Sequence, residues 1–330
     1  MAAMPSPLAA IARWRLSPRH FGRTTTWAAW AVAAAVVSGA SVRLTGSGLG
    51  CSDWPSCTSQ HLVAPLAFHP WMEFGNRLLN VAVTVVVAVV AIAAVMRSPR
   101  RRDLLVLSGG LIAGVLAEAV VGGVVVLTHL APQWVSAHFL VSMLLLADAV
   151  VLRHRARLPD RIGVSGRVHA AGPPQPQVTR GAELLARLLL LMTAVVVTLG
   201  TVVTSTGPHG GDPRAPRFHF SLHSVAQLHG TAVESLLAVT LLTLWVLYRT
   251  GAPRPVLHRA EIMLGVMAAQ ALIGYTQYFS GDPALLVGFH VAGALSVVTA
   301  VLWFNLNLRR RPAPAALTSD AVVLPVLTAT

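Results

Sequence analysis

Residues 71–96 read WMEFGNRLLNVAVTVVVAVVAIAAVM, a long apolar run that opens with a short polar segment. A helix needs about 20 residues to cross the hydrocarbon core of a membrane, which is ~30 Å thick. The run therefore predicts a transmembrane helix. Seven other stretches have a similar character, and the eight expected spans lie near 24–42, 71–96, 104–127, 134–152, 183–203, 224–248, 260–279 and 284–308. The composition of the chain, 55% hydrophobic and 11% charged, is typical of a membrane protein.

The basic residues are all arginines, and their positions predict how the chain is oriented. They gather in the two tails and in every second connection: Arg13, Arg15, Arg19, Arg23; Arg97, Arg100, Arg101, Arg102; Arg153, Arg155, Arg157, Arg161, Arg167, Arg180; Arg249, Arg254, Arg259; and Arg309, Arg310, Arg311. The opposite loops contain only Arg43, Arg214 and Arg217. Positively charged loops stay in the cytoplasm, so we expect a multi-pass protein of the plasma membrane with both termini cytoplasmic. The net charge of +13 thus indicates topology and not a nucleic-acid partner.

The two halves of the chain resemble each other. Short patterns of the first half recur in the second: G-x-x-V-x-x-T-G at 39–46 and 200–207, Gly114 and Gly123 as Gly265 and Gly274, and His138 as His290. Each half has an even number of spans, so both halves enter the membrane with the same orientation, as parallel repeats do. We therefore expect an all-α polytopic protein of eight transmembrane helices in two pseudo-symmetric four-helix bundles.

A polar segment rich in proline and glycine separates these halves and predicts a cytoplasmic linker. The expected divisions are a cytoplasmic tail at 1–23, an N-terminal bundle at 24–153, the linker at 154–182, a C-terminal bundle at 183–308 and a second cytoplasmic tail at 309–330.

Histidines occupy matched positions near one end of the spans. His229 and His290 are 61 residues apart, and Asn76 and His138, at the equivalent positions of the first half, are 62 residues apart. Imidazoles at equal depth on neighbouring helices are suited to axial ligation of an iron porphyrin. The alternative is that each histidine is simply satisfied by hydrogen bonds within its bundle.

Glu73 and Glu118 are carboxyl groups inside expected spans, where ionisable groups are costly and usually functional. Glu73 lies one turn before Asn76, and Arg77 can pair either with Glu73 or with a porphyrin propionate. The alternative for Glu73 is an interfacial carboxyl that reaches water. Glu118 lies deeper and has no evident partner in the sequence.

The two cysteines, Cys51 and Cys57, fall in the first loop on the side opposite the arginine clusters. A thiol pair outside the cytoplasm favours a disulfide, with two free thiols as the alternative. Two ligands without nearby partners do not make a closed metal site.

Two loop motifs resemble one known family. The run Arg43-Leu44-Thr45-Gly46-Ser47-Gly48-Leu49-Gly50-Cys51-Ser52-Asp53-Trp54-Pro55-Ser56-Cys57 is similar to the first outer loop of the heme A synthase family. Thr206-Gly207-Pro208-His209-Gly210-Gly211-Asp212 resembles the equivalent loop of the second half. The resemblance covers nearly the whole chain outside the tails and the linker. It implies eight transmembrane helices in two bundles and an enzyme that oxidises the C8 methyl group of heme O to a formyl group.

The resemblance also assigns residues. The C-terminal bundle of the family holds a heme b cofactor between two histidines, which map onto His229 and His290. The N-terminal bundle receives heme O, and its catalytic glutamate maps onto Glu73. The family's cysteine pair maps onto Cys51 and Cys57. The two substrate-side histidines map onto His138 and Asn76, and Arg77 is expected beside them at the substrate heme. The expected iron ligands are the three mapped histidines, His229, His290 and His138.

Asn76 departs from the family pattern, because an amide does not replace imidazole as a strong ligand of heme iron. Either His138 alone holds heme O, or one of His61, His69 and His129 substitutes. The main alternative function is a di-heme b-type electron carrier without synthase activity. A heme exporter fits less well, since the loop lacks a dense tryptophan motif. Expected partners are heme O and the membrane enzyme that makes it, with a homo-oligomer possible and the electron partner unspecified.

Overall fold

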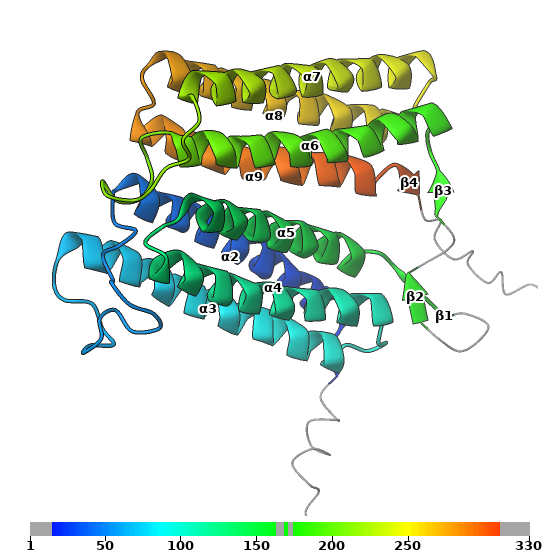
Figure 1. The fold of residues 1–330 in the computed structure, drawn as a ribbon. Coiled ribbons are helices and arrows are strands. Elements are labelled where there is room, and N and C mark those ends of the chain that lie inside the picture. The colour runs from blue at the N-terminus through cyan, green and yellow to red at the C-terminus, as the bar shows by residue number, and fades with distance from the viewer. Residues whose placement is uncertain (1–14, 163–167, 171–173, 311–330) are drawn as a thin grey trace, which may run out of the picture.

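The computed structural model describes residues 15–162, 168–170 and 174–310 (Figure 1). Its helices are α2 (Pro18–Leu44), α3 (Phe68–Met96), α4 (Arg102–Leu127), α5 (Pro132–Ala156), α6 (Arg180–Thr206), α7 (Leu222–Arg249), α8 (Arg254–Phe279) and α9 (Ala284–Leu306). Its strands are β1 (Asp160–Ile162), β2 (Val168–Ala170), β3 (Gln175–Pro176) and β4 (Arg309–Arg310). In this part of the chain, eight helices are long and apolar enough to cross a membrane, which confirms the expected spans. The chain is a multi-pass membrane protein.

Most helices extend a few residues beyond the apolar run that predicted them. The side chains of Ser17, Thr179 and Ser221 accept hydrogen bonds from backbone N–H groups in the first turns of α2, α6 and α7. Such N-caps let a helix begin before its apolar face does. Helix α8 begins at Arg254, six residues before the expected span, and Pro255 lies in its first turn, where proline is well tolerated.

The eight helices form two bundles of four, as expected (Figure 1). Helices α2 to α5 surround one hydrophobic core, in which Val87 and Leu152 are fully buried. Helices α6 to α9 surround a second core, in which Met263 and Phe304 are buried. Helix α9 contacts both, because its Leu295 packs into the first core. The bundles are therefore in direct apolar contact.

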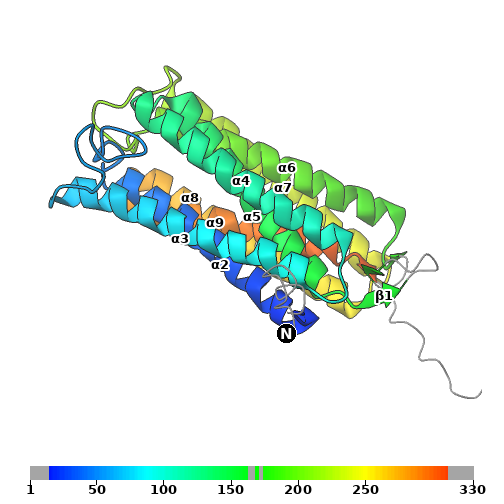
Figure 2. The same ribbon diagram turned by 90° about the horizontal axis from the view of Figure 1, so that it is seen from below.

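The loops that follow α2 and α6 lie beside each other at one end of the helices, which we call the loop end (Figures 1 and 2). The N–H of Gly48 donates to the carbonyl oxygen of Gly211 at 2.8 Å. Arg43, at the end of α2, donates to the carbonyl oxygens of Thr204 at 2.7 Å and His209 at 2.5 Å. The repeated T-G motifs of the two halves thus bind each other and join the bundles at this end.

At the opposite end, which we call the linker end, the chain forms short strands that the sequence did not predict. β1 pairs antiparallel with β2, and β3 with β4. Strands of two or three residues are too short to carry a hydrophobic pattern that would reveal them. Apart from these strands, the regular secondary structure of the described residues is helical.

Two arginines at the linker end are buried and not free surface charges, Arg97 being 1% exposed and Arg101 0%. Arg97 Nη2 donates to both carboxylate oxygens of Asp160, at 2.8 and 2.9 Å. Arg101 donates to the Asp103 carboxylate and, at 3.1 Å, to the carbonyl oxygen of Leu158. These guanidinium groups fasten the start of the linker to the first bundle.

This arrangement predicts that Asp160→Asn destabilises the protein. The substitution keeps the size of the side chain but leaves the buried Arg97 guanidinium without its carboxylate, which typically costs about 3 kcal/mol. We expect a clearly lower thermal unfolding midpoint in detergent. Glu183→Gln is the matched control, because its partner Arg309 is 47% exposed and such pairs contribute little. Equal unfolding midpoints for the two variants would contradict the stabilising role of the Arg97–Asp160 ion pair.

Candidate functional site

Each of the four matched ligand positions packs against a glycine of a neighbouring helix near the loop end. A Cβ atom added at the glycine would lie within contact distance of the facing side chain: 2.8 Å from His290 Cε1 at Gly274, 3.2 Å from His229 Cε1 at Gly200, 3.3 Å from His138 Cε1 at Gly122, and 3.5 Å from Asn76 Nδ2 at Gly39. Each side chain therefore rests directly on a helix backbone. The four contacts are two copies of one arrangement, because Gly39 and Gly200 belong to the same repeated motif.

The packing corrects one detail of the repeat. The spacing of the sequence pattern pairs Gly274 with Gly123, yet Gly122 is the glycine that contacts His138. Gly122 and Gly274 are 152 residues apart, as are His138 and His290. Gly123 instead faces the loop residue Trp54, whose Cδ2 would lie 2.9 Å from an added Cβ.

In the C-terminal bundle, the rings of His229 and His290 face each other across the space between α7 and α9. Their centroids are 6.4 Å apart and their planes are inclined by 69°. A metal held between two imidazole nitrogens, with bonds of about 2.0–2.1 Å each, would place the centroids roughly 6–6.5 Å apart. The Nδ1 atoms of both rings are buried without a regular hydrogen-bond partner. The separation of the rings and the glycine cradles fit an iron porphyrin held between the two imidazoles.

In the N-terminal bundle, His138 has a carboxylate partner. Its Nδ1 atom lies 2.8 Å from Glu118 Oε2, although the N–H is not aligned for a regular hydrogen bond. Ser142 Oγ donates to Glu118 Oε1 at 3.0 Å. Glu118 is therefore not without a partner, as it looked from the sequence, because one turn of α5 brings both Ser142 and His138 to it. The Nε2 atom of His138 makes no hydrogen bond within the described part of the chain.

Asn76 occupies the place that His229 has in the other bundle. Asn80 Nδ2 donates to Asn76 Oδ1 at 2.7 Å, so the oxygen of the Asn76 amide is engaged and its nitrogen faces Gly39. Of the histidine alternatives, His69 is engaged elsewhere. His69 binds Ser47 Oγ at 2.9 Å, at the start of α3.

Glu73 is buried, with 6% exposure, and is held by the loop that follows α2. The N–H of Cys51 donates to Glu73 Oε2 at 2.8 Å. Arg77 Nη2 lies 2.5 Å from Glu73 Oε1, which realises the first of the two pairings open to Arg77. Gly50 makes this fit possible, since a Cβ there would lie 2.3 Å from the carbonyl oxygen of His69. Glu73 is thus an ion-paired group inside the protein and not a carboxyl that reaches water.

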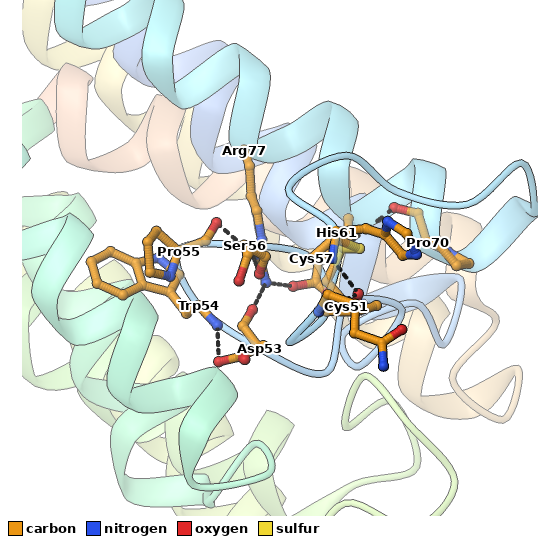
Figure 3. Close-up of a disulfide and its surroundings, with 12 residues drawn as sticks. Cys51, Asp53, Trp54, Pro55, Ser56, Cys57, His61, Pro70 and Arg77 are labelled. Carbon is orange, nitrogen blue, oxygen red and sulfur yellow. Dashed lines mark hydrogen bonds and ion pairs between the residues drawn. A yellow bond between two sulfur atoms is a disulfide. The ribbon is translucent and has the colours of Figure 1, made fainter.

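The same guanidinium organises the disulfide loop (Figure 3). Arg77 donates to the carbonyl oxygens of Asp53 at 3.0 Å and Ser56 at 2.9 Å. Cys51 and Cys57 are joined as expected, with Cα atoms 4.4 Å apart. One ion pair therefore connects Glu73 to the loop that the disulfide closes.

Three contributors were missed from the sequence: Asn80, Ser142, and the role of Glu118 as a partner of His138. A signal was present for Glu118, because it precedes Gln270 by the same 152 residues that separate the two histidines. That match places Glu118 and Gln270 at equivalent positions of the two bundles.

The fold and these residues define a polytopic membrane protein with a duplicated histidine site in paired four-helix bundles. The family described as cytochrome oxidase assembly protein matches residues 23–69 and 63–208, more than half of the chain. The chain therefore belongs to the heme A synthase family of cytochrome oxidase assembly proteins.

Three relatives carry the name heme A synthase. The protein from Geobacillus kaustophilus strain HTA426 is 36% identical over 146 residues, which is 43% of this chain and 44% of the relative. The protein from Geobacillus thermodenitrificans is 38% identical over 98 residues, 29% of this chain and 30% of the relative. The chain thus matches less than half the length of these two. The protein from Alkalihalophilus pseudofirmus is 25% identical over 288 residues, 84% of this chain and 93% of the relative.

Proposed function

We propose that the chain is a heme A synthase, which oxidises the C8 methyl group of heme O to a formyl group through successive hydroxylations. The observation that carries this proposal is the asymmetry of the duplicated site. Glu73 and Arg77 of the first bundle correspond by position to Ala226 and Gly230 of the second. A buried, ion-paired carboxylate therefore lies beside only one of the two ligand positions.

The cofactor side is the C-terminal bundle, where His229 and His290 would hold a heme b. The heme would supply one-electron chemistry there. The chain itself contributes placement. The two helices fix the two rings, and Gly200 and Gly274 let the rings approach the backbone of the neighbouring helices closely.

The substrate side is the N-terminal bundle, where His138 binds the iron of heme O and Asn76 lies at the matched position. Glu73 is held by the Cys51 N–H and by Arg77, so its carboxylate keeps a fixed place near the porphyrin site. A fixed carboxylate can stabilise positive charge that develops at the methyl group, or accept a proton from it. The disulfide loop covers this carboxylate and excludes water from it.

The alternative is a di-heme b-type electron carrier, which the facing His229 and His290 rings also suit. It offers no role for a buried carboxylate at one site only. Extraction of the hemes after expression beside a source of heme O separates the two functions, since only a synthase yields the formyl product. The enzyme that makes heme O is the partner expected to supply the substrate, and a homo-oligomer is compatible with the exposed apolar helix faces.

The proposed location is the plasma membrane, with both termini cytoplasmic and the loop end outside. A reporter fused after Arg310 should therefore behave as cytoplasmic, and one inserted at Pro213 as external, because the arginine clusters lie on the linker side. Accessibility of the two reporters in intact cells measures this. The reverse pattern would overturn the charge argument.

Gly274→Ala should disturb heme b as His290→Ala does. The added Cβ would lie 2.8 Å from His290 Cε1, so the imidazole must move away from the iron. We expect loss or strong perturbation of the low-spin heme spectrum in both variants. Gly265→Ala is the matched control on the same helix, because an added Cβ there meets nothing within 4 Å. An unchanged spectrum in His290→Ala would rule out this ligand.

Glu73→Gln should abolish formation of heme A while heme b remains bound. The amide has nearly the volume of the carboxylate but lacks its charge and basicity, so the fold should persist. Heme A in a solvent extract, measured by chromatography, should fall by at least tenfold, in line with the usual contribution of acid–base groups. Normal output would mean that Glu73 does not act on the methyl group.

A further inference from the structure

The two bundles differ in a coordinated way around their matched ligands. Three pairs of equivalent positions carry different residues: Asn76 and His229, Glu118 and Gln270, and Ser142 and Ala294. The last two pairs are each 152 residues apart, as are His138 and His290. The differences therefore surround one site and lie on both sides of it.

On the His138 side, the first bundle presents an anion to the ring. Glu118 Oε2 lies 2.8 Å from His138 Nδ1. Ser142 Oγ lies 3.0 Å from the other carboxylate oxygen and 3.1 Å from the carbonyl oxygen of His138, so its single proton is shared between these two acceptors. The Glu118 side chain is only 17% exposed, so it faces the protein and not the lipid. Its position beside the nitrogen that does not bind metal is that of a group that orients a histidine ligand.

The second bundle uses the equivalent residue differently. Gln270 Nε2 donates to the backbone carbonyl oxygen of His290 at 2.9 Å, one helix turn from the ring. Its oxygen lies over Gly293, where an added Cβ would be 1.8 Å away. The equivalent of Gly293 in the first bundle is Val141, which already has a Cβ atom at the matching position. Gln270 therefore holds the helix, whereas Glu118 holds the imidazole.

On the opposite side of the site, the first bundle replaces an imidazole by an amide pair. Asn80 donates to both oxygens of Asn76, Oδ1 at 2.7 Å and the backbone carbonyl at 3.0 Å. The amide nitrogen of Asn76 is left to face Gly39. The second bundle has Val233 at the position of Asn80. The amide nitrogen is a hydrogen-bond donor without a free lone pair, so it cannot ligate iron.

We propose that the N-terminal bundle holds its iron porphyrin on His138 alone, with Glu118 as the positioning residue of that ligand and the coordination position on the Asn76 side open to a small exchangeable ligand. This rests on the proposed function for the identity of the porphyrin. A carboxylate at Nδ1 fixes the ring and raises its strength as a ligand. A single strong ligand compensates for the missing second one, which explains why the anion occurs in the bundle that lacks the second histidine.

The test uses full-length protein purified from cells that make both heme b and heme O, with carbon monoxide as the probe of an open iron position. In the reduced wild-type protein, we expect one of the two hemes to bind carbon monoxide and the other not. His138→Ala should remove the reactive heme. Asn76→His, which copies His229, should abolish carbon monoxide binding and add a low-spin heme signal.

Glu118→Gln, which copies Gln270, tests the positioning role. We expect about tenfold weaker retention of the reactive heme on dilution, and an upward shift of its reduction potential because a neighbouring negative charge is lost. The unreactive heme should keep its spectrum and potential, which reports an intact fold. Gln270→Glu is the matched control and should leave the reactive heme unchanged. If Glu118→Gln does not fold, Ser142→Ala should shift the same two quantities in the same direction.

Absence of a carbon monoxide-binding heme in the wild type would overturn the proposal, as would unchanged binding in Asn76→His. Unchanged retention and potential in both Glu118→Gln and Ser142→Ala would remove the role of Glu118. Heme A extracted from the same cells separates this outcome from the function. Heme A formed by a protein with two unreactive hemes contradicts only the open position, whereas a reactive heme without heme A contradicts only the synthase activity.

Discussion

At four places near the loop end, a glycine lets a polar side chain rest on the backbone of the next helix, and both candidate sites depend on these close contacts. An imidazole in a membrane protein must be satisfied by a ligand or a hydrogen bond, because the hydrocarbon offers neither. At Gly200 and Gly274, two rings are brought to a centroid separation of 6.4 Å with their Nδ1 atoms buried. A single methyl group at Gly274 would displace one of them. The space left by the glycines therefore determines where the imidazoles lie, and their chemistry depends on that placement.

Duplication supplied two copies of this arrangement, and substitution made them different. The second copy keeps two histidines and has the neutral Gln270 at the position of Glu118. The first copy has one histidine, an anion behind it, and a buried carboxylate at Glu73. Two facing imidazoles saturate an iron and favour electron transfer. A site with a single imidazole and a nearby fixed carboxylate is suited to chemistry on the porphyrin itself.

The sequence predicted the fold well because transmembrane spans follow from length and hydropathy, which need no knowledge of contacts. The disulfide also followed from the sequence, because both cysteines fall in one loop. The matched depths of Asn76, His138 and His229 followed because the spacing along a helix sets the depth of a residue. The sequence did not predict which side chains contact each other across neighbouring helices. Glu118 looked isolated because its partners come from α5, and only the packing of α4 on α5 unites them. The sequence pattern cannot distinguish Gly122 from Gly123. In a helix, however, neighbouring residues point about 100° apart, so only Gly122 contacts His138.

The loop end couples these elements into one unit. Gly48 binds Gly211 and Arg43 binds Thr204, so the motifs that follow α2 and α6 hold the two bundles in register where the sites lie. The same first loop continues into the disulfide, whose Cys51 N–H holds Glu73. A change in the geometry of that loop therefore acts on the carboxylate through one hydrogen bond and on the neighbouring bundle through another. The placement of Glu73 is therefore a property of both halves together, which is why neither bundle can be understood by itself.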